Sequence, residues 1–184
     1  MLATQSFFVL PPNPPKASGG TETEYGDYYS HRFTTSGTLT VTIAATMDIF
    51  MVAGGGGGGF GSFGGGGGAG GVRIGAFAME TGDYTITIGQ GGNWGSEIGG
   101  SARISAAGGN TTIVKSGWTG GDSSGTTITA NGGGLGGSED TNPSGGSTVG
   151  GAGGSGGGGS TNGAGGAGMD DGSPFGILGN QGYN

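Results

Sequence analysis

The sequence contains no cysteine. Disulfide bonds, thiol nucleophiles and thiolate metal sites are therefore excluded together. Charged side chains are also scarce: they make up 9% of the 184 residues, with five basic against twelve acidic side chains and a net charge of −7. Nucleic-acid binding depends on clustered cations. Because the few basic residues are scattered along the chain, nucleic acid is not expected as a partner.

Long hydrophobic runs are missing as well. No stretch approaches the ~20 apolar residues that a membrane-spanning helix needs. The N-terminal sequence MLATQSFFVLPPNPPKA has no basic start, and its apolar run ends at Pro11-Pro12. It is therefore not expected to act as a secretory signal. We expect the protein to reach its destination through assembly or lysis.

Glycine is what the chain has in excess, with 55 residues against a usual share of roughly 7%. The densest stretch, Ala53 to Gly71, reads AGGGGGGFGSFGGGGGAGG and lies between two apolar runs typical of strands. It is either a flexible linker or an ordered structure that only glycine permits.

A second glycine-rich stretch has a period of three. Seven positions lie three apart and are mostly separated by Gly-Gly pairs, and six of them are not glycine. These positions are Val149, Ala152, Ser155, Gly158, Thr161, Ala164 and Ala167. A left-handed polyproline-II-type helix has three residues per turn, so this phase would form one edge at a surface while bare glycine backbone packs against neighbouring chains. Collagen is excluded because two of every three positions are glycine and proline is rare here. The pattern predicts a bundle of polyglycine-II helices, with 53–71 as an outgoing and returning pair that reverses at Phe60 and Phe63.

Polar and apolar residues alternate in 38–43 and 84–88, and 48–52 is a short apolar run; with a further strand at 72–79, they predict a small antiparallel β unit before the main glycine region. The expected strands are 38–43, 48–52, 72–79 and 84–88, with shorter pieces at 102–105, 111–114 and 126–130. Glycine disfavours helix interiors, so the expected fold class is mainly β with no α-helix of note. The predicted core consists of Leu39, Val41, Ile43, Ile49, Met51, Ile74, Phe77, Tyr84, Ile86 and Ile88.

Four regions follow from these patterns. Residues 1–30 are interpreted as an extended N-terminal attachment arm, because PPNPP favours an extended path. Residues 31–92 hold the β unit with the first glycine pair, 93–168 the glycine bundle with its loops, and 169–184 a C-terminal cap or tail. The arm could instead pack on its own domain. Its attachment candidates are Phe7, Phe8, Leu10, Pro11, Pro12, Tyr25, Tyr28 and Tyr29.

No pattern typical of an enzyme is present. The glycine run after Val52 lacks the Lys-Ser/Thr and the helix of a phosphate-binding loop. His31 is the single histidine, and a lone histidine is usually structural. The acidic pairs Glu139-Asp140 and Asp170-Asp171 are interpreted as solvated loop acids rather than glycosidase or calcium sites. We expect neither a catalytic site, nor a cofactor, nor a metal.

Aromatic residues in the polar loops are the better functional candidates. Trp94 and Trp118 either cap the ends of the glycine bundle or offer flat surfaces to a partner. The candidate contact residues are Phe60, Phe63, Asn93, Trp94, Trp118, Asp122, Glu139, Asp140 and Asn142.

The order of elements resembles a known family. HRFTTSGTLTVTIAATMDIFMVAGGGGGG, then GGGGGAGG, ETGDYTITIGQGG and repeated Gly-Gly blocks resemble the glycine-rich, polyglycine-II type domain of bacteriophage tail fibre and adhesin proteins. The resemblance covers about residues 31–168. It implies a virion protein, assembled in the host cytoplasm, at a tail fibre tip or acting as an adhesin, whose loops recognise a host cell-surface glycan or outer-membrane protein. It also implies other virion proteins as partners of the arm, and a homotrimer. The alternatives are a fibre or capsid decoration protein that acts as a rigid spacer, and an ice-binding glycine-helix protein.

Overall fold

The chain is mainly β. A computed structural model describes residues 16–95, 105–122, 125–139, 148–161 and 163–169. Every pairing between the named strands in these ranges is antiparallel, and no α-helix occurs in them. The predicted piece at 102–105 falls largely outside the described residues.

The largest sheet has five strands in the order β1-β4-β7-β8-β9. Its strands are β1 (Ala17–Ser18), β4 (Gly37–Val41), β7 (Gly82–Thr87), β8 (Thr111–Val114) and β9 (Thr127–Ala130). Two further sheets have two strands each: β2 (Thr21–Tyr25) with β3 (Tyr28–Arg32), and β5 (Ala45–Val52) with β6 (Val72–Met79). Thus β1, β2 and most of β3 come from the segment 1–30 that the sequence analysis assigns to an arm.

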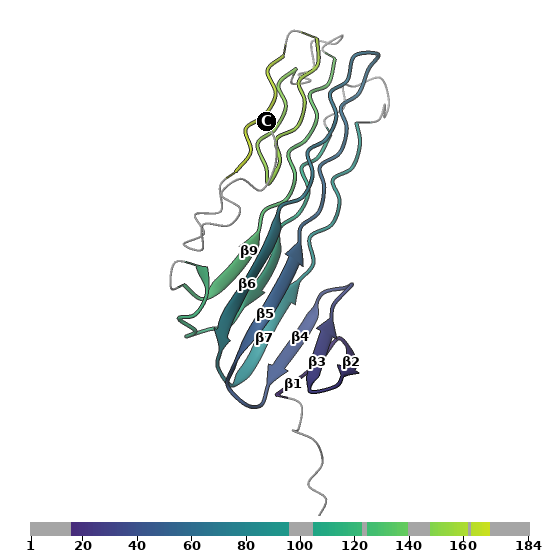
Figure 1. The fold of residues 1–184 in the computed structure, drawn as a ribbon. Coiled ribbons are helices and arrows are strands. Elements are labelled where there is room, and N and C mark those ends of the chain that lie inside the picture. The colour runs from purple at the N-terminus through teal and green to yellow at the C-terminus, as the bar shows by residue number, and fades with distance from the viewer. Residues whose placement is uncertain (1–15, 96–104, 123–124, 140–147, 162, 170–184) are drawn as a thin grey trace, which may run out of the picture.

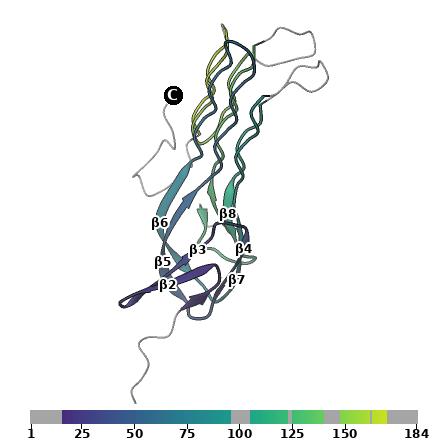
Figure 2. The same ribbon diagram turned by 90° about the vertical axis from the view of Figure 1, so that its right-hand side faces the viewer.

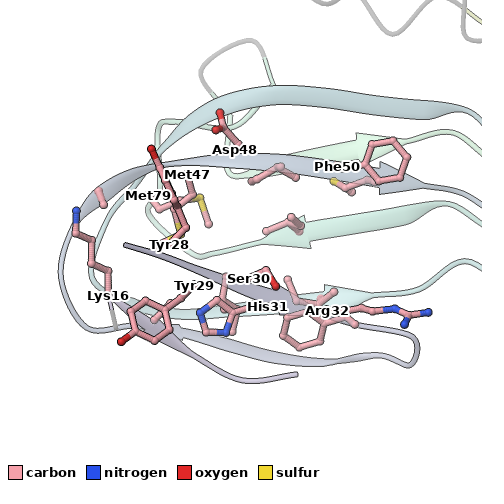
Figure 3. A pocket seen from close by; sticks show the side chains of 18 of the residues that line it. Lys16, Tyr28, Tyr29, Ser30, His31, Arg32, Met47, Asp48, Phe50 and Met79 are labelled. Atoms are coloured by element: carbon pink, nitrogen blue, oxygen red, sulfur yellow. The ribbon is translucent and has the colours of Figure 1, made fainter. Parts of the chain in front are cut away.

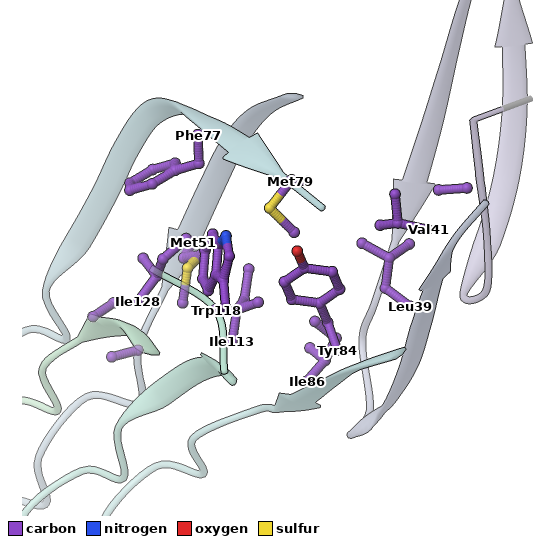
Figure 4. Packing of buried hydrophobic residues seen from close by; sticks show 13 residues of the cluster. Leu39, Val41, Met51, Phe77, Met79, Tyr84, Ile86, Ile113, Trp118 and Ile128 are labelled. Carbon is purple, nitrogen blue, oxygen red and sulfur yellow. The ribbon is translucent and has the colours of Figure 1, made fainter. Parts of the chain in front are cut away.

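The hydrophobic core lies between the five-stranded sheet and the β5–β6 pair (Figure 4). Tyr84 is fully buried, and its ring meets that of Trp118 edge to face, with the centroids 5.2 Å apart. The other buried apolar residues include Leu39, Val41, Met51, Phe77, Met79, Ile86, Ile113, Ile128 and Ala130. Ile49 and Ile88, also expected in the core, are partly buried against it.

Two residues of the predicted core are exposed, and for them the prediction is wrong. Ile43 follows the end of β4 and is 45% exposed, while Ile74 is 59% exposed. Side chains alternate between the two faces of a strand, and β6 buries Arg73, Phe77 and Met79 on its inner face. Ile74 therefore points outward.

The buried charge of Arg73 is balanced from a distant loop. Its guanidinium donates to the Asp122 carboxylate and lies over the Phe77 ring, 5.9 Å from the centroid. The second carboxylate oxygen of Asp122 accepts from the Thr129 amide at 2.7 Å. An uncompensated buried charge is costly, so this pair fixes the loop before β9 against β6.

The glycine-rich segments leave the sheets at one end and run side by side as an elongated set of wavy chains (Figures 1 and 2). We call this set the glycine array; it consists of residues 53–59, 64–71, 89–95, 105–109, 131–139, 148–160 and 163–169. The first segment continues β5, and the second leads back into β6.

Hydrogen bonds in the glycine array recur at every third residue. Between the antiparallel segments 53–59 and 64–71, amide donors and carbonyl acceptors pair as Ala53 with Gly71, Gly56 with Gly68, and Gly59 with Gly65. The amides of Gly54 and Gly57 instead donate to segment 105–109. Carbonyl groups of segment 53–59 accept hydrogen bonds from amides of 89–95 and of 131–139. A β-strand bonds within one plane with a repeat of two, whereas this segment bonds to neighbours in several directions.

The close approach of these chains leaves no room for side chains at most positions. A Cβ at Gly134 would lie 1.9 Å from the Gly151 oxygen, and one at Gly56 would lie 2.0 Å from the Gly134 oxygen. The seven positions spaced by three between 149 and 167 lie on the open side: six of them, Gly158 included, are exposed, and Ser155 is half-buried. Glycine is therefore required by packing, and side chains are tolerated on one edge.

Candidate functional site

The far end of the glycine array contains a tight reversal that presents two aromatic residues. The chain turns through Gly61, whose φ is 103°, and the Gly64 amide donates to the Gly61 carbonyl at 3.2 Å. Phe63 is 65% exposed, and Phe60 is half-buried. We call this end of the molecule, formed by residues 59–64, 93–95, 137–139 and 159–161, the tip.

Two residues of a distant segment hold this reversal. The Ser138 hydroxyl accepts from the Phe60 amide at 3.1 Å, and the Glu139 amide donates to the Phe60 carbonyl at 2.8 Å. The Glu139 carboxylate also accepts from the Ser62 amide at 2.9 Å. The buried Ser160 hydroxyl in turn donates to the Ser138 carbonyl at 2.9 Å. Three hydrogen bonds thus tie the reversal to Ser138 and Glu139, and Ser160 in turn bonds to Ser138.

Trp94 lies at the same end and is 71% exposed. The Gly95 amide donates to the Gly58 carbonyl at 2.9 Å, and the Ala106 amide donates to the Asn93 carbonyl, also at 2.9 Å. These bonds place Trp94 beside the residues that lead into the reversal. The tip therefore brings together Phe60, Phe63, Asn93, Trp94 and Glu139 of the candidate contact residues.

The two remaining candidates that the structure describes, Trp118 and Asp122, are not at the tip. Trp118 is 1% exposed and donates from its indole nitrogen to the Ala78 carbonyl at 2.9 Å. It is a core residue that cannot offer a surface to a partner, which corrects the expectation for this loop. Asp122 is engaged with Arg73, as described above, and Asp140 and Asn142 lie outside the described residues.

The attachment candidates divide in a similar way. Tyr25 and Tyr28 are 65% and 79% exposed on the β2–β3 hairpin, and Tyr29 is half-buried. Phe7, Phe8, Leu10, Pro11 and Pro12 lie outside the described residues.

Tyr84 is an ionisable residue of the core rather than of these surfaces. Burial raises the pKa of Tyr84 above its ordinary value, although the hydrogen bond from the Glu80 amide and the charge of Lys115 oppose this shift.

Among the described residues there is no group of three or more His, Asp or Glu side chains arranged to hold a metal ion. That part of the chain also has no helix long and apolar enough to cross a membrane.

A groove between β3 and β5 has no counterpart in the sequence analysis (Figure 3). Its volume is about 830 Å³, and its floor includes Leu39, Ile86 and Ile113 from the five-stranded sheet. Residues 27–34 form one side and residues 45–52 the other. The sequence could not indicate it, because the groove depends on which strands remain unpaired.

The arrangement of strands and glycine segments agrees with one comparison with known proteins. A family model described as a glycine-rich domain matches residues 34–184. The chain belongs to this glycine-rich domain family. No curated protein and no solved structure matches the chain. The family match covers β4 to β9 and the whole glycine array, and it begins after the β2–β3 hairpin.

Proposed function

We propose that the segments of the glycine array are polyglycine-II helices. The hydrogen-bond repeat of three residues supports this, because such a helix has three residues per turn and presents successive amides to neighbours in different directions. The close Cβ distances support it further, since only chains without side chains can pack this tightly. Lateral N–H···O=C bonds, each with a net value of about 1 kcal/mol, offset the entropy cost of ordering glycine.

We further propose that the protein is a bacteriophage virion component, a tail fibre tip or adhesin, that uses the tip to contact the host surface. The observation that carries this proposal is the exposed aromatic pair Trp94 and Phe63 on a hydrogen-bonded scaffold. Aromatic side chains held in place lose little entropy on binding and are common hot spots in interfaces. They are suited to the faces of sugar rings or the loops of an outer-membrane protein.

Host-cell adsorption by particles carrying the double variant Trp94→Ala/Phe63→Ala tests this function. A pair of hot-spot aromatics contributes about 2 kcal/mol or more, so we expect adsorption affinity to fall by roughly thirtyfold. The matched control is Ile74→Ser, which removes a comparably exposed apolar side chain from the outer face of β6, far from the tip. It should adsorb normally.

The result that would overturn the adhesin function is normal adsorption by particles that contain the double variant in full amount. The same result would favour the spacer function, in which the glycine array separates two virion parts without a receptor. Failure of the variant to enter particles would instead place the tip in virion assembly and would also contradict host contact as its role.

A further inference from the structure

The groove between β3 and β5 is bordered by two strand edges. Among the described residues, β3 pairs only with β2, and β5 pairs only with β6. The groove is lined by every successive residue from 27 to 34 and from 45 to 52. Alternate residues of a strand point to opposite faces, so a surface that touches all of them runs along the edges. The backbone donors and acceptors of both edges therefore face the same opening.

The floor of this opening is apolar. Leu39, Ile86 and Ile113 are buried residues of the five-stranded sheet, and Met47 and Ile49 of β5 are partly buried beside them. The five-stranded sheet is thus faced by two separate pairs of strands with a gap between them (Figure 3). An extended segment with alternate apolar side chains would fill the gap, bond to both edges and cover the floor, as in β-strand addition.

We propose that this groove binds the N-terminal segment Phe7-Phe8-Val9-Leu10 of a second copy of the chain. Phenylalanine and valine favour strands, and this is the apolar run of the 15 residues that precede the described structure. The described chain begins at Lys16, which itself lines the groove. Strand β3 is five residues long, so a donor of four or five residues matches its length. The product is one continuous sheet, β2-β3-donor-β5-β6, facing the five-stranded sheet.

The sequence between the segment and the groove favours exchange between copies. In Leu10-Pro11-Pro12-Asn13-Pro14-Pro15, four residues directly precede a proline and are thereby restricted to extended conformations. Five residues of polyproline-II conformation span about 15 Å. A reversal that returned the segment to its own groove would have to occur inside this stiff run. The inference does not depend on the adhesin function, because it concerns self-assembly alone.

Disulfide cross-linking between full-length chains tests the proposal, and the absence of native cysteine makes it clean. One set of variants carries a single cysteine at each of residues 7 to 10. The second chain carries Thr46→Cys, an exposed residue of β5 that lines the groove. The matched control is Thr85→Cys, an exposed residue of β7 outside the groove. Mixed chains are oxidised and the cross-linked product is quantified on non-reducing gels.

We expect at least one of the four donor positions to give about tenfold more heterodimer with Thr46→Cys than with Thr85→Cys, because docking raises the local concentration of the two thiols. Equal yields with the two partners would contradict binding in the groove. An intrachain cross-link in a doubly substituted chain, with no product from mixed chains, would contradict exchange between copies.

A second measurement checks the same proposal through charge. In a strand, Phe7 and Val9 face one side and Phe8 and Leu10 face the other. Light-scattering mass of the full chain should fall to the monomer when lysines replace the pair that faces the floor, and less when they replace the other pair. Two results together would overturn the proposal: light scattering shows the unmodified chain to be a monomer, and none of the cysteine mixtures gives a cross-link at the same concentration.

Discussion

The substitution Gly134→Ala tests whether packing, rather than flexibility, requires the glycines. A Cβ at this position would lie 1.9 Å from the Gly151 oxygen and 2.8 Å from the Gly157 nitrogen. To reach an ordinary contact of 3.4 Å, the Gly151 oxygen would have to withdraw by about 1.5 Å. That shift would lengthen the bond that the Gly151 oxygen accepts from the Gly157 amide, now 2.9 Å, and would disturb the bond from the Gly151 amide to the Leu135 carbonyl, now 2.8 Å. Both would then lie beyond the range of hydrogen bonds.

The expected cost follows from these changes. Two lost hydrogen bonds contribute about 1 kcal/mol each, and forcing a methyl group into a packed interior adds about 1–3 kcal/mol. The lower conformational entropy of alanine in the unfolded chain offsets about 0.4–1 kcal/mol of this loss. The net loss of unfolding free energy is about 2–5 kcal/mol. For a chain of this size, this lowers Tm by roughly 4–20 °C.

Gly66→Ala is the matched control. It lies in the same array, its φ is not in the left-handed region, and a Cβ there would meet no atom within 4 Å. We expect this variant to be stabilised by about 0.4–1 kcal/mol, since only the unfolded-state entropy changes. Calorimetric unfolding of both variants and the unmodified chain in one buffer provides the comparison. Equal shifts of Tm for the two substitutions would refute the packing argument and would favour flexible linkers.

Three further predictions concern the β unit. Asp122→Asn removes the negative charge of the carboxylate that pairs with the buried Arg73 guanidinium and should lower the unfolding free energy in urea by about 3 kcal/mol. Glu80→Gln, at the exposed end of the Lys115 pair, should cost less than about 1 kcal/mol, and equal costs would contradict the role of the buried pair. Because burial raises the pKa of Tyr84, the folded chain retains a proton that the unfolded chain loses above a pH of about 10. The unfolding free energy should therefore be unaffected by this group below that pH and fall above it. In Tyr84→Phe, the fall of unfolding free energy at alkaline pH should be less steep. If the variant and the unmodified chain lose stability identically with pH, Tyr84 is not the source of the loss. Trp118→Ala should cost about 3–5 kcal/mol in thermal or urea unfolding, and a cost typical of a surface residue would mean that this side chain is not in the core.

The sequence was informative wherever a local pattern decides the structure. Alternation in 38–43 and in 84–88 predicts β4 and β7 to within about two residues of the bounds that the structure has. The period of three between 149 and 167 identifies the edge of the glycine array that is exposed. Both patterns express repeats of the backbone itself, two residues for a strand and three for the glycine segments.

Features that depend on distant partners could not be predicted. Either face of β6 reads as apolar, with Val72 and Ile74 on one side and Phe77 and Met79 on the other. The choice depends on Asp122, 49 residues away, which makes a buried Arg73 possible. The prediction that Trp118 offers a surface to a partner is wrong for a similar reason, because the polar sequence of its loop does not reveal that the Trp118 ring packs against Tyr84. The joint position of Phe63 and Trp94 at the tip required the spatial order of the glycine segments.

Amide hydrogen exchange in residues 53–59 and 131–139, measured by NMR, tests the central claim most directly. That claim is that the glycine array is an ordered set of polyglycine-II helices that carries the tip. Within the part of the chain that the structure describes, the amides of Gly54, Gly56, Gly57 and Gly59 donate to other segments, whereas those of Gly55 and Gly58 do not. The account predicts slow exchange interrupted at every third residue. Uniformly fast exchange, or slow exchange at every second residue, would contradict it.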